Sequence, residues 1–103
     1  MKLLSVTACA AGVAHTFMAA ESIEKAAKEY GHEIKVETQG AIGIENRLTD
    51  EEISAADAVL LTTDIPIRER ERFASSNIFN VSSTAMIKSA NKIIEAIENS
   101  FKE

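Results

Sequence analysis

The chain has 103 residues, of which 46% are hydrophobic and 26% are charged, and its formal net charge at pH 7 is −5. This length and apolar fraction predict one domain over residues 1–103 with a real core, and they argue against disorder. The chain has no apolar run of roughly 18 residues, which argues against a membrane span. The acidic balance argues against nucleic-acid binding, and two His and one Cys without ligand spacing predict no metal and no cofactor.

The first part of the chain predicts a strand, a helix and a second strand. Residues 2–8 form a short apolar run followed by small residues, which is typical of a buried strand. From residue 16 apolar residues recur every three or four positions, the spacing of one helix face, and Gly31 ends this helix. Residues 32–38 then alternate, which predicts an edge strand with a wetter face that carries Glu33, Lys35 and Glu37.

The second part predicts shorter elements. Residues 39–43 contain two glycines and form a loop that we expect to be too long for a tight hairpin. Thr49 and Glu52 have the spacing of a capping box and open a short helix. Residues 58–63 are typical of a buried strand, residues 68–72 of a short charged helix or turn, and residues 78–81 of a brief last strand. An apolar stripe over residues 86–101 predicts a C-terminal helix.

Alternating strands and helices predict an α/β fold: a single open, mostly parallel sheet of about four strands, flanked by helices in a Rossmann-like three-layer arrangement. Right-handed crossovers and a second strand at the edge give the order 2-1-3-4. Ligands bind such sheets at the switch point, beyond the carboxyl ends of the strands. The loops after the first and third strands meet there, so we expect the site in them.

The loop over residues 9–16 combines three features of an anion site. It precedes a helix N-terminus, whose unpaired N–H groups favour an anion. Its small residues, Gly12 among them, allow successive amides to converge on one centre. Cys9 opens the loop, where the same amides favour its thiolate and suit it to attack a phosphoryl group. From the residues alone, a Cys9 that is only a small buried hydrophobe fits equally well.

The order of residues in this loop adds a resemblance to a known family. Residues 9–21, CAAGVAHTFMAAE, resemble the phosphorylation-loop signature of the fructose-type enzyme IIB components of the bacterial phosphoenolpyruvate-dependent sugar phosphotransferase system. Residues 36–46, VETQGAIGIEN, resemble the family's second motif, and the pairs at residues 56–57 and 72–73 match as well. The family's usual Pro-Thr or Pro-Met after the cysteine is Ala10-Ala11 here, and the missing proline loosens the loop.

The resemblance implies a phosphoryl relay. A IIA partner carrying phosphohistidine would phosphorylate Cys9, and the phosphocysteine would pass its phosphoryl group to a sugar, fructose or a related hexose, held by a membrane-embedded IIC transporter. We therefore expect a cytoplasmic phosphotransferase that reaches the inner face of the membrane through IIC. Cys9 would be the catalytic residue, in a phosphate-binding loop made of Ala10, Ala11, Gly12, Val13, Ala14, His15 and Thr16.

Within this loop, His15 would stabilise the thiolate or the phosphate, or only shape the loop, and we expect Thr16 to be the N-cap of the helix. The rim of the site and its partner-facing surface would comprise Gln39, Gly40, Asp64, Arg68 and Arg72. A carboxylate at Asp64 would repel phosphate, which favours a capping role. The alternating Arg and Glu of residues 68–72 are typical of a solvated face, and the alternative is a basic cluster that meets an acidic partner.

Two other functions stay open. One is a low-molecular-weight phosphatase-like hydrolase with a similar cysteine loop, although this chain has His15 where such enzymes have an arginine. The other is a non-catalytic regulatory module in which Cys9 is structural. Turnover of an aryl phosphate would favour the first, and failure of Cys9 to accept phosphate would favour the second.

Overall fold

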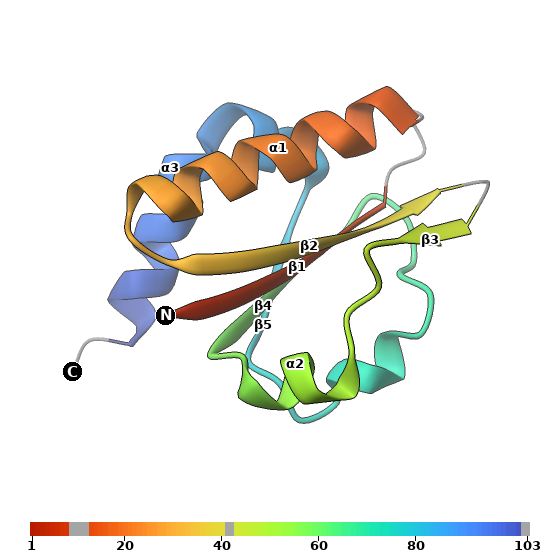
Figure 1. Ribbon diagram of the computed structural model, residues 1–103. Coiled ribbons are helices and arrows are strands. Elements are labelled where there is room, and N and C mark those ends of the chain that lie inside the picture. Colours follow the sequence, from red (N-terminus) through yellow and green to blue (C-terminus); the bar gives the residue numbers. More distant parts are fainter. Residues whose placement is uncertain (9–12, 41–42, 102–103) are drawn as a thin grey trace.

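The computed structural model describes residues 1–8, 13–40 and 43–101. Within these ranges five strands form one sheet in the order β3-β2-β1-β4-β5 (Figure 1). β2 and β4 pair with β1 in parallel, β5 pairs with β4 in parallel, and β3 is antiparallel to β2. The strands are β1 (Lys2–Ala8), β2 (Glu33–Gly40), β3 (Gly43–Glu45), β4 (Ala58–Thr62) and β5 (Ile78–Val81).

The four strands expected from the sequence correspond to β1, β2, β4 and β5, and their relative order is the predicted 2-1-3-4. The expectation that the second strand is an edge strand is wrong, because β3 pairs with its outer side. The additional strand β3 corrects the expectation of a loop at residues 39–43. β2 extends to Gly40, which pairs with Gly43, so only positions 41 and 42 separate the paired residues. Gly43 has a φ of 131°, a conformation that glycine adopts without steric cost. A strand of three residues is too short to show a period, so the alternation could not reveal it.

Helices cover both faces of the sheet and complete the three layers (Figure 1). α1 (Val13–Glu29) and α3 (Ser83–Ser100) lie on one face, and α2 (Asp50–Ala55) and the 3-10 helix η1 (Arg70–Phe73) lie on the other. Neighbouring residues of β1 point to opposite faces, so Leu3 packs in the core under α1 and α3, and Leu4 packs in the core under α2 and η1. No helix in the described ranges is long and apolar enough to cross a membrane.

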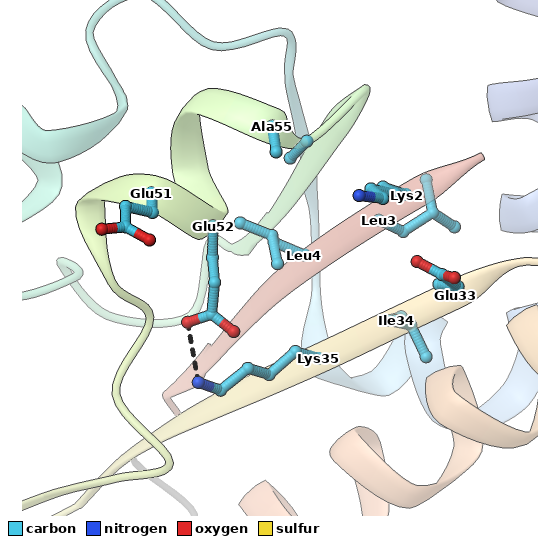
Figure 2. A pocket seen from close by; sticks show the side chains of 10 residues that line it. Lys2, Leu3, Leu4, Glu33, Ile34, Lys35, Glu51, Glu52 and Ala55 are labelled. Atoms are coloured by element: carbon cyan, nitrogen blue, oxygen red, sulfur yellow. Dashed lines mark hydrogen bonds and ion pairs between the residues drawn. The ribbon is translucent and has the colours of Figure 1, made fainter.

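The capping box before α2 is confirmed. The Thr49 side chain accepts from the N–H of Glu52 at 3.1 Å, and the Glu52 carboxylate accepts from the N–H of Thr49 at 2.9 Å. The same Glu52 oxygen, Oε1, is 2.7 Å from Nζ of Lys35 on β2. Figure 2 shows this ion pair beside a pocket of about 360 Å³ between α2 and the first residues of β1 and β2. This pocket lies at the amino ends of the strands, away from the switch point.

The expectation of a wet face on β2 is wrong at Glu37. Its side chain is 0% exposed, although it alternates with Ile34, Val36 and Thr38 as a solvent-facing residue should. The segment around Leu48 and η1 covers this part of the strand and supplies polar partners to the carboxylate. Glu33, at the start of β2, is exposed as expected.

Candidate functional site

The predicted site lies at the edge of the sheet where the carboxyl ends of β1, β2, β4 and β5 meet. β1 ends at Ala8, and α1 begins at Val13 (Figure 1). Cys9, Ala10, Ala11 and Gly12, the first part of the expected phosphate-binding loop, lie outside the described residues. Val13, Ala14, His15 and Thr16 form the first turn of α1. Thr16 is therefore inside the helix and is not its N-cap, because α1 starts earlier than the periodicity of the apolar residues indicates.

A threonine that sequence analysis missed fixes the end of β1. The buried Oγ1 of Thr62, at the end of β4, accepts from the backbone N–H of Ala8 at 2.9 Å and donates to the carbonyl of Ala8 at 3.0 Å. Paired residues of β1 and β4 end at Val6 and Leu61, so this side chain continues the connection past the last pair. The residue directly before Cys9 is thus held on both of its backbone polar groups. The available signal was a threonine at the end of the strand that neighbours β1.

Three side chains from distant parts of the chain form a hydrogen-bonded series on this edge. Oγ of Ser83, the first residue of α3, donates to Oδ2 of Asp64 at 2.8 Å and lies 3.3 Å from Nδ1 of His15. The N–H of Ser83 also donates to Oδ1 of Asp64, at 2.7 Å. Asp64 therefore caps the first turn of α3, in keeping with the capping role expected for it. Sequence analysis did not single out Ser83, which has no distinguishing pattern.

The electrostatics of Asp64 follow from these contacts. Burial raises the pKa of the Asp64 carboxyl, but the two hydrogen bonds from Ser83 and the nearby charge of His15 lower it more, so the net pKa lies below its usual value. Asp64 is therefore a carboxylate at neutral pH, and both of its oxygens accept hydrogen bonds.

Gln39 connects β2 to the segment that follows β4. Its side chain is 4% exposed; Oε1 accepts from the N–H of Arg68 at 2.8 Å and Nε2 donates to the carbonyl of Arg68 at 3.0 Å. Gly40, beside it, pairs with Gly43 in the hairpin. The Arg68 side chain is exposed, and no ion pair involves it among the described residues. Arg68 thus offers a solvent-facing positive charge on the expected rim.

The structure places Arg72 elsewhere. Its side chain is 9% exposed and donates from Nη1 and Nη2 to the two carboxylate oxygens of Glu37, each at 2.9 Å. The Arg72 guanidinium also lies 4.9 Å from the centre of the Phe73 ring. Arg72 is neither on a solvated face nor available to a partner, which corrects both interpretations of it. The basic cluster at residues 68–72 is divided between an exposed Arg68 and an Arg72 whose guanidinium is paired with the buried Glu37.

The arrangement as a whole suits an anion more than a cation. In the described part of the chain, no three His, Cys, Asp or Glu side chains gather closely enough to hold a metal ion. α1 begins at the edge of the sheet where β1 ends, and helix N-termini are places where proteins bind anions.

Comparison with known proteins finds relatives that cover almost the whole chain. The family model described as "PTS system, Lactose/Cellobiose specific IIB subunit" matches residues 5–96. The PTS system fructose-like EIIB component 2 of Escherichia coli (strain K12) is 54% identical over 97 residues, 94% of this chain and 92% of that protein. The fructose-like PTS system EIIBC component of the same strain is 41% identical over 99 residues, which cover 94% of this chain and 20% of that protein.

A solved structure shows the same fold. The solution structure of an enzyme IIB subunit of the PTS system from Escherichia coli K12 has a TM-score of 0.90 and 43% identity to this chain, covering 96% of this chain and 92% of the other. The chain therefore belongs to the enzyme IIB family of the bacterial sugar phosphotransferase system, among its fructose-like members, which are sugar phosphotransfer modules.

Proposed function

We propose that Cys9 carries the phosphoryl group, receiving it from a phosphohistidine of a IIA partner and passing it to a sugar, fructose or a related hexose, bound by a membrane IIC transporter. The observation that carries the proposal is the place of Cys9 in the chain. It directly follows β1, the central strand, and α1 begins a few residues later at Val13. A nucleophile between a strand end and a helix N-terminus is close to donors that stabilise an anionic phosphoryl group.

This relay consists of two phosphoryl transfers. The Cys9 thiolate attacks phosphorus, the P–S bond forms and the P–N bond breaks, and the imidazole of the donor leaves with the electron pair. A sugar hydroxyl then attacks the phosphocysteine: a P–O bond forms, the P–S bond breaks with its electron pair on sulfur, and the hydroxyl proton passes to water. The thiolate is regenerated, so Cys9 is ready for the next turnover. Ala10, Ala11, Gly12, Val13, Ala14, His15 and Thr16 would supply backbone donors and shape to the loop.

The surface around this edge supports an encounter with protein partners. Two large apolar side chains on the first part of α1 are exposed, Phe17 by 44% and Met18 by 51%. Arg68 adds an exposed positive charge to a chain whose net charge is −5. Because IIA and IIC must reach the same cysteine, they would use overlapping parts of this surface in turn. The chain would then act at the inner face of the membrane through its contact with IIC, without inserting into it.

Intact-mass measurement after incubation with phosphorylated IIA tests the proposal, with Cys9→Ser as the control variant. A gain of one phosphoryl group in the wild type alone would support the carrier function and identify the nucleophile. Turnover of an aryl phosphate without a stable phosphoprotein would instead support the hydrolase. A folded protein that takes up no phosphoryl group from a competent donor would support a regulatory module with a structural Cys9.

A further inference from the structure

The hydrogen-bonded series Asp64–Ser83–His15 has a direction, which follows from counting protons. Asp64 is a carboxylate and can only accept. The Ser83 hydroxyl has one proton, and at 2.8 Å from Oδ2 of Asp64 this proton is donated to the carboxylate. Ser83 can then only accept from Nδ1 of His15, which lies 3.3 Å from Oγ. The proton of the imidazole must therefore be on Nδ1 for this contact to be a hydrogen bond.

The series is also held in place on both sides of Ser83. Ser83 is 0% exposed, and its N–H donates to the other oxygen of Asp64 at 2.7 Å, so carboxylate and serine are joined by two hydrogen bonds. His15 is in the first turn of α1, and Ser83 is the first residue of α3, whose helix packs beside α1. Neither the hydroxyl nor the carboxylate can turn away without losing a partly buried hydrogen bond.

We propose that Asp64 and Ser83 are positioning residues that fix the His15 imidazole with its Nδ1 proton directed at Ser83. Nε2 is then the nitrogen of the neutral His15 ring that can accept a hydrogen bond or a proton during phosphoryl transfer. The second part of the inference rests on the proposed function, and the first part does not. A carrier needs such a group because its loop gains negative charge when Cys9 is phosphorylated and loses it on transfer.

The second histidine of the chain supplies an internal reference. Nδ1 of His32 lies 3.0 Å from the N-terminal ammonium of Met1, which can only donate, and Nε2 of His32 lies 2.7 Å from Oε2 of Glu98, which accepts. The same proton count assigns the proton of neutral His32 to Nε2. The two histidines are therefore expected in opposite tautomers.

Long-range ¹H–¹⁵N NMR spectra of the histidine rings, recorded above the pH at which the rings are protonated, test the tautomers directly. We expect a protonated Nδ1 in His15 and a protonated Nε2 in His32. Asp64→Asn should move the proton of the neutral His15 ring from Nδ1 to Nε2. The new amide NH₂ donates to Ser83 Oγ, so the Ser83 hydroxyl must then donate to Nδ1 of His15. Ser83→Ala should remove the hydrogen bond that holds the Nδ1 proton, so the fraction of His15 protonated on Nδ1 should fall.

Asp57→Asn is the matched control, because the Asp57 carboxylate also accepts from a backbone N–H, that of Lys2 at 2.8 Å, but at the amino ends of the strands. Asp57→Asn should leave the tautomers of both histidines unchanged, and the tautomer of His32 should be the same in every variant. A His15 protonated on Nε2 in the wild type would overturn the inference, as would a tautomer unaffected by both Asp64→Asn and Ser83→Ala.

The kinetic readout separates this inference from the proposed function. With phosphorylated IIA as donor, Asp64→Asn and Ser83→Ala should lower the saturated rate of Cys9 phosphorylation by about tenfold or more, as large as the loss when a metal-bound histidine is deprived of its hydrogen-bond partner. The KM for the donor should stay unchanged, because neither side chain is proposed to contact IIA. Phosphorylation at the wild-type rate in both variants would overturn the positioning role. No phosphorylation of the wild type, with the expected tautomers, would overturn the proposed function while the tautomer assignment stands.

Discussion

Arg72 and Glu37 form a two-point ion pair inside the protein. Nη1 and Nη2 of Arg72 each lie 2.9 Å from one carboxylate oxygen of Glu37, and the two side chains are 9% and 0% exposed. The N–H of Leu48 and Nε2 of Gln39 donate to the same carboxylate at 2.9 and 2.8 Å. The pair thereby connects β2 with η1, and Gln39 extends the connection to the backbone of Arg68 on the rim.

Removing one member of this pair should destabilise the fold strongly. Arg72→Met leaves the Glu37 carboxylate buried without its cation, and breaking a buried pair in this way costs about 3–5 kcal/mol. Urea unfolding measures the loss. Arg70→Met is the matched control, because Arg70 is exposed and its contact is a 3.3 Å hydrogen bond to Asn80, so its free energy of unfolding should change by no more than about 0.5 kcal/mol. Equal losses in the two variants would show that the buried pair has no special role.

The same carboxylate predicts a dependence of stability on pH. Burial raises the pKa of Glu37, but hydrogen bonds from Arg72, Gln39 and Leu48 outweigh it, and the net pKa in the folded protein is below its usual value. A group with a depressed folded pKa stabilises the protein above its unfolded pKa and loses that contribution as the pH falls through the folded one. The free energy of unfolding should therefore fall below about pH 4.5. Glu37→Gln should show a shallower fall over this range, and an identical slope in the two proteins would contradict the assignment.

The hydroxyl of Thr62 should matter to both stability and phosphoryl transfer. Thr62→Val keeps the shape but leaves the backbone N–H of Ala8 without the acceptor seen here, at a cost of about 1–3 kcal/mol for a buried unsatisfied donor. Because Ala8 directly precedes Cys9, the rate of Cys9 phosphorylation should fall as well. Thr62→Ser retains the hydroxyl and should keep the wild-type rate. A Thr62→Val protein that is phosphorylated at the wild-type rate would show that the end of β1 needs no such support.

Arg68 should act on the encounter with the phosphoryl donor. Arg68→Glu reverses an exposed charge, and a rim charge changes association more than it changes the chemical step. We expect a lower kcat/KM with phosphorylated IIA, with an effect that shrinks as ionic strength rises. Lys2→Glu makes the same change of charge at the amino ends of the strands and should leave kcat/KM near the wild-type value. Equal effects of the two variants would point to net charge and not to the position of Arg68.

Local patterns in the sequence were enough to predict the four main strands, their relative order and the capping box formed by Thr49 and Glu52. Each of these depends on residues close together in the chain or on general rules for crossovers. β3 has too few residues for a period, and its pairing depends on Gly43, whose positive φ does not show in an alternation. Thr16 was wrongly predicted to be the N-cap of α1, because apolar spacing shows which face of a helix is buried but not where the helix begins.

The site was predictable only in part, for a related reason. Asp64, Gln39 and Arg68 were candidates because the sequence predicted strands ending before them; Gln39 in fact lies within β2, and the structure places all three at the expected edge. Ser83 and Thr62 take part through partners more than 50 residues away, His15 and Ala8. Glu37 looked solvent-facing because alternation does not tell what covers a face of the sheet, and its cation comes from η1.

The two outer strands of the sheet have a consequence for how copies of the protein meet. β3 and β5 contain three and four residues, and β3 covers β2 only from Thr38 onward. On the uncovered part of β2, Glu33 and Lys35 are charged, and Asn46 Nδ2 donates to the carbonyl of Val36 at 3.1 Å. Short strands, charges and an occupied carbonyl all hinder another chain from adding a strand there. The short outer strands and these polar groups thereby guard the sheet against pairing with other copies of the chain.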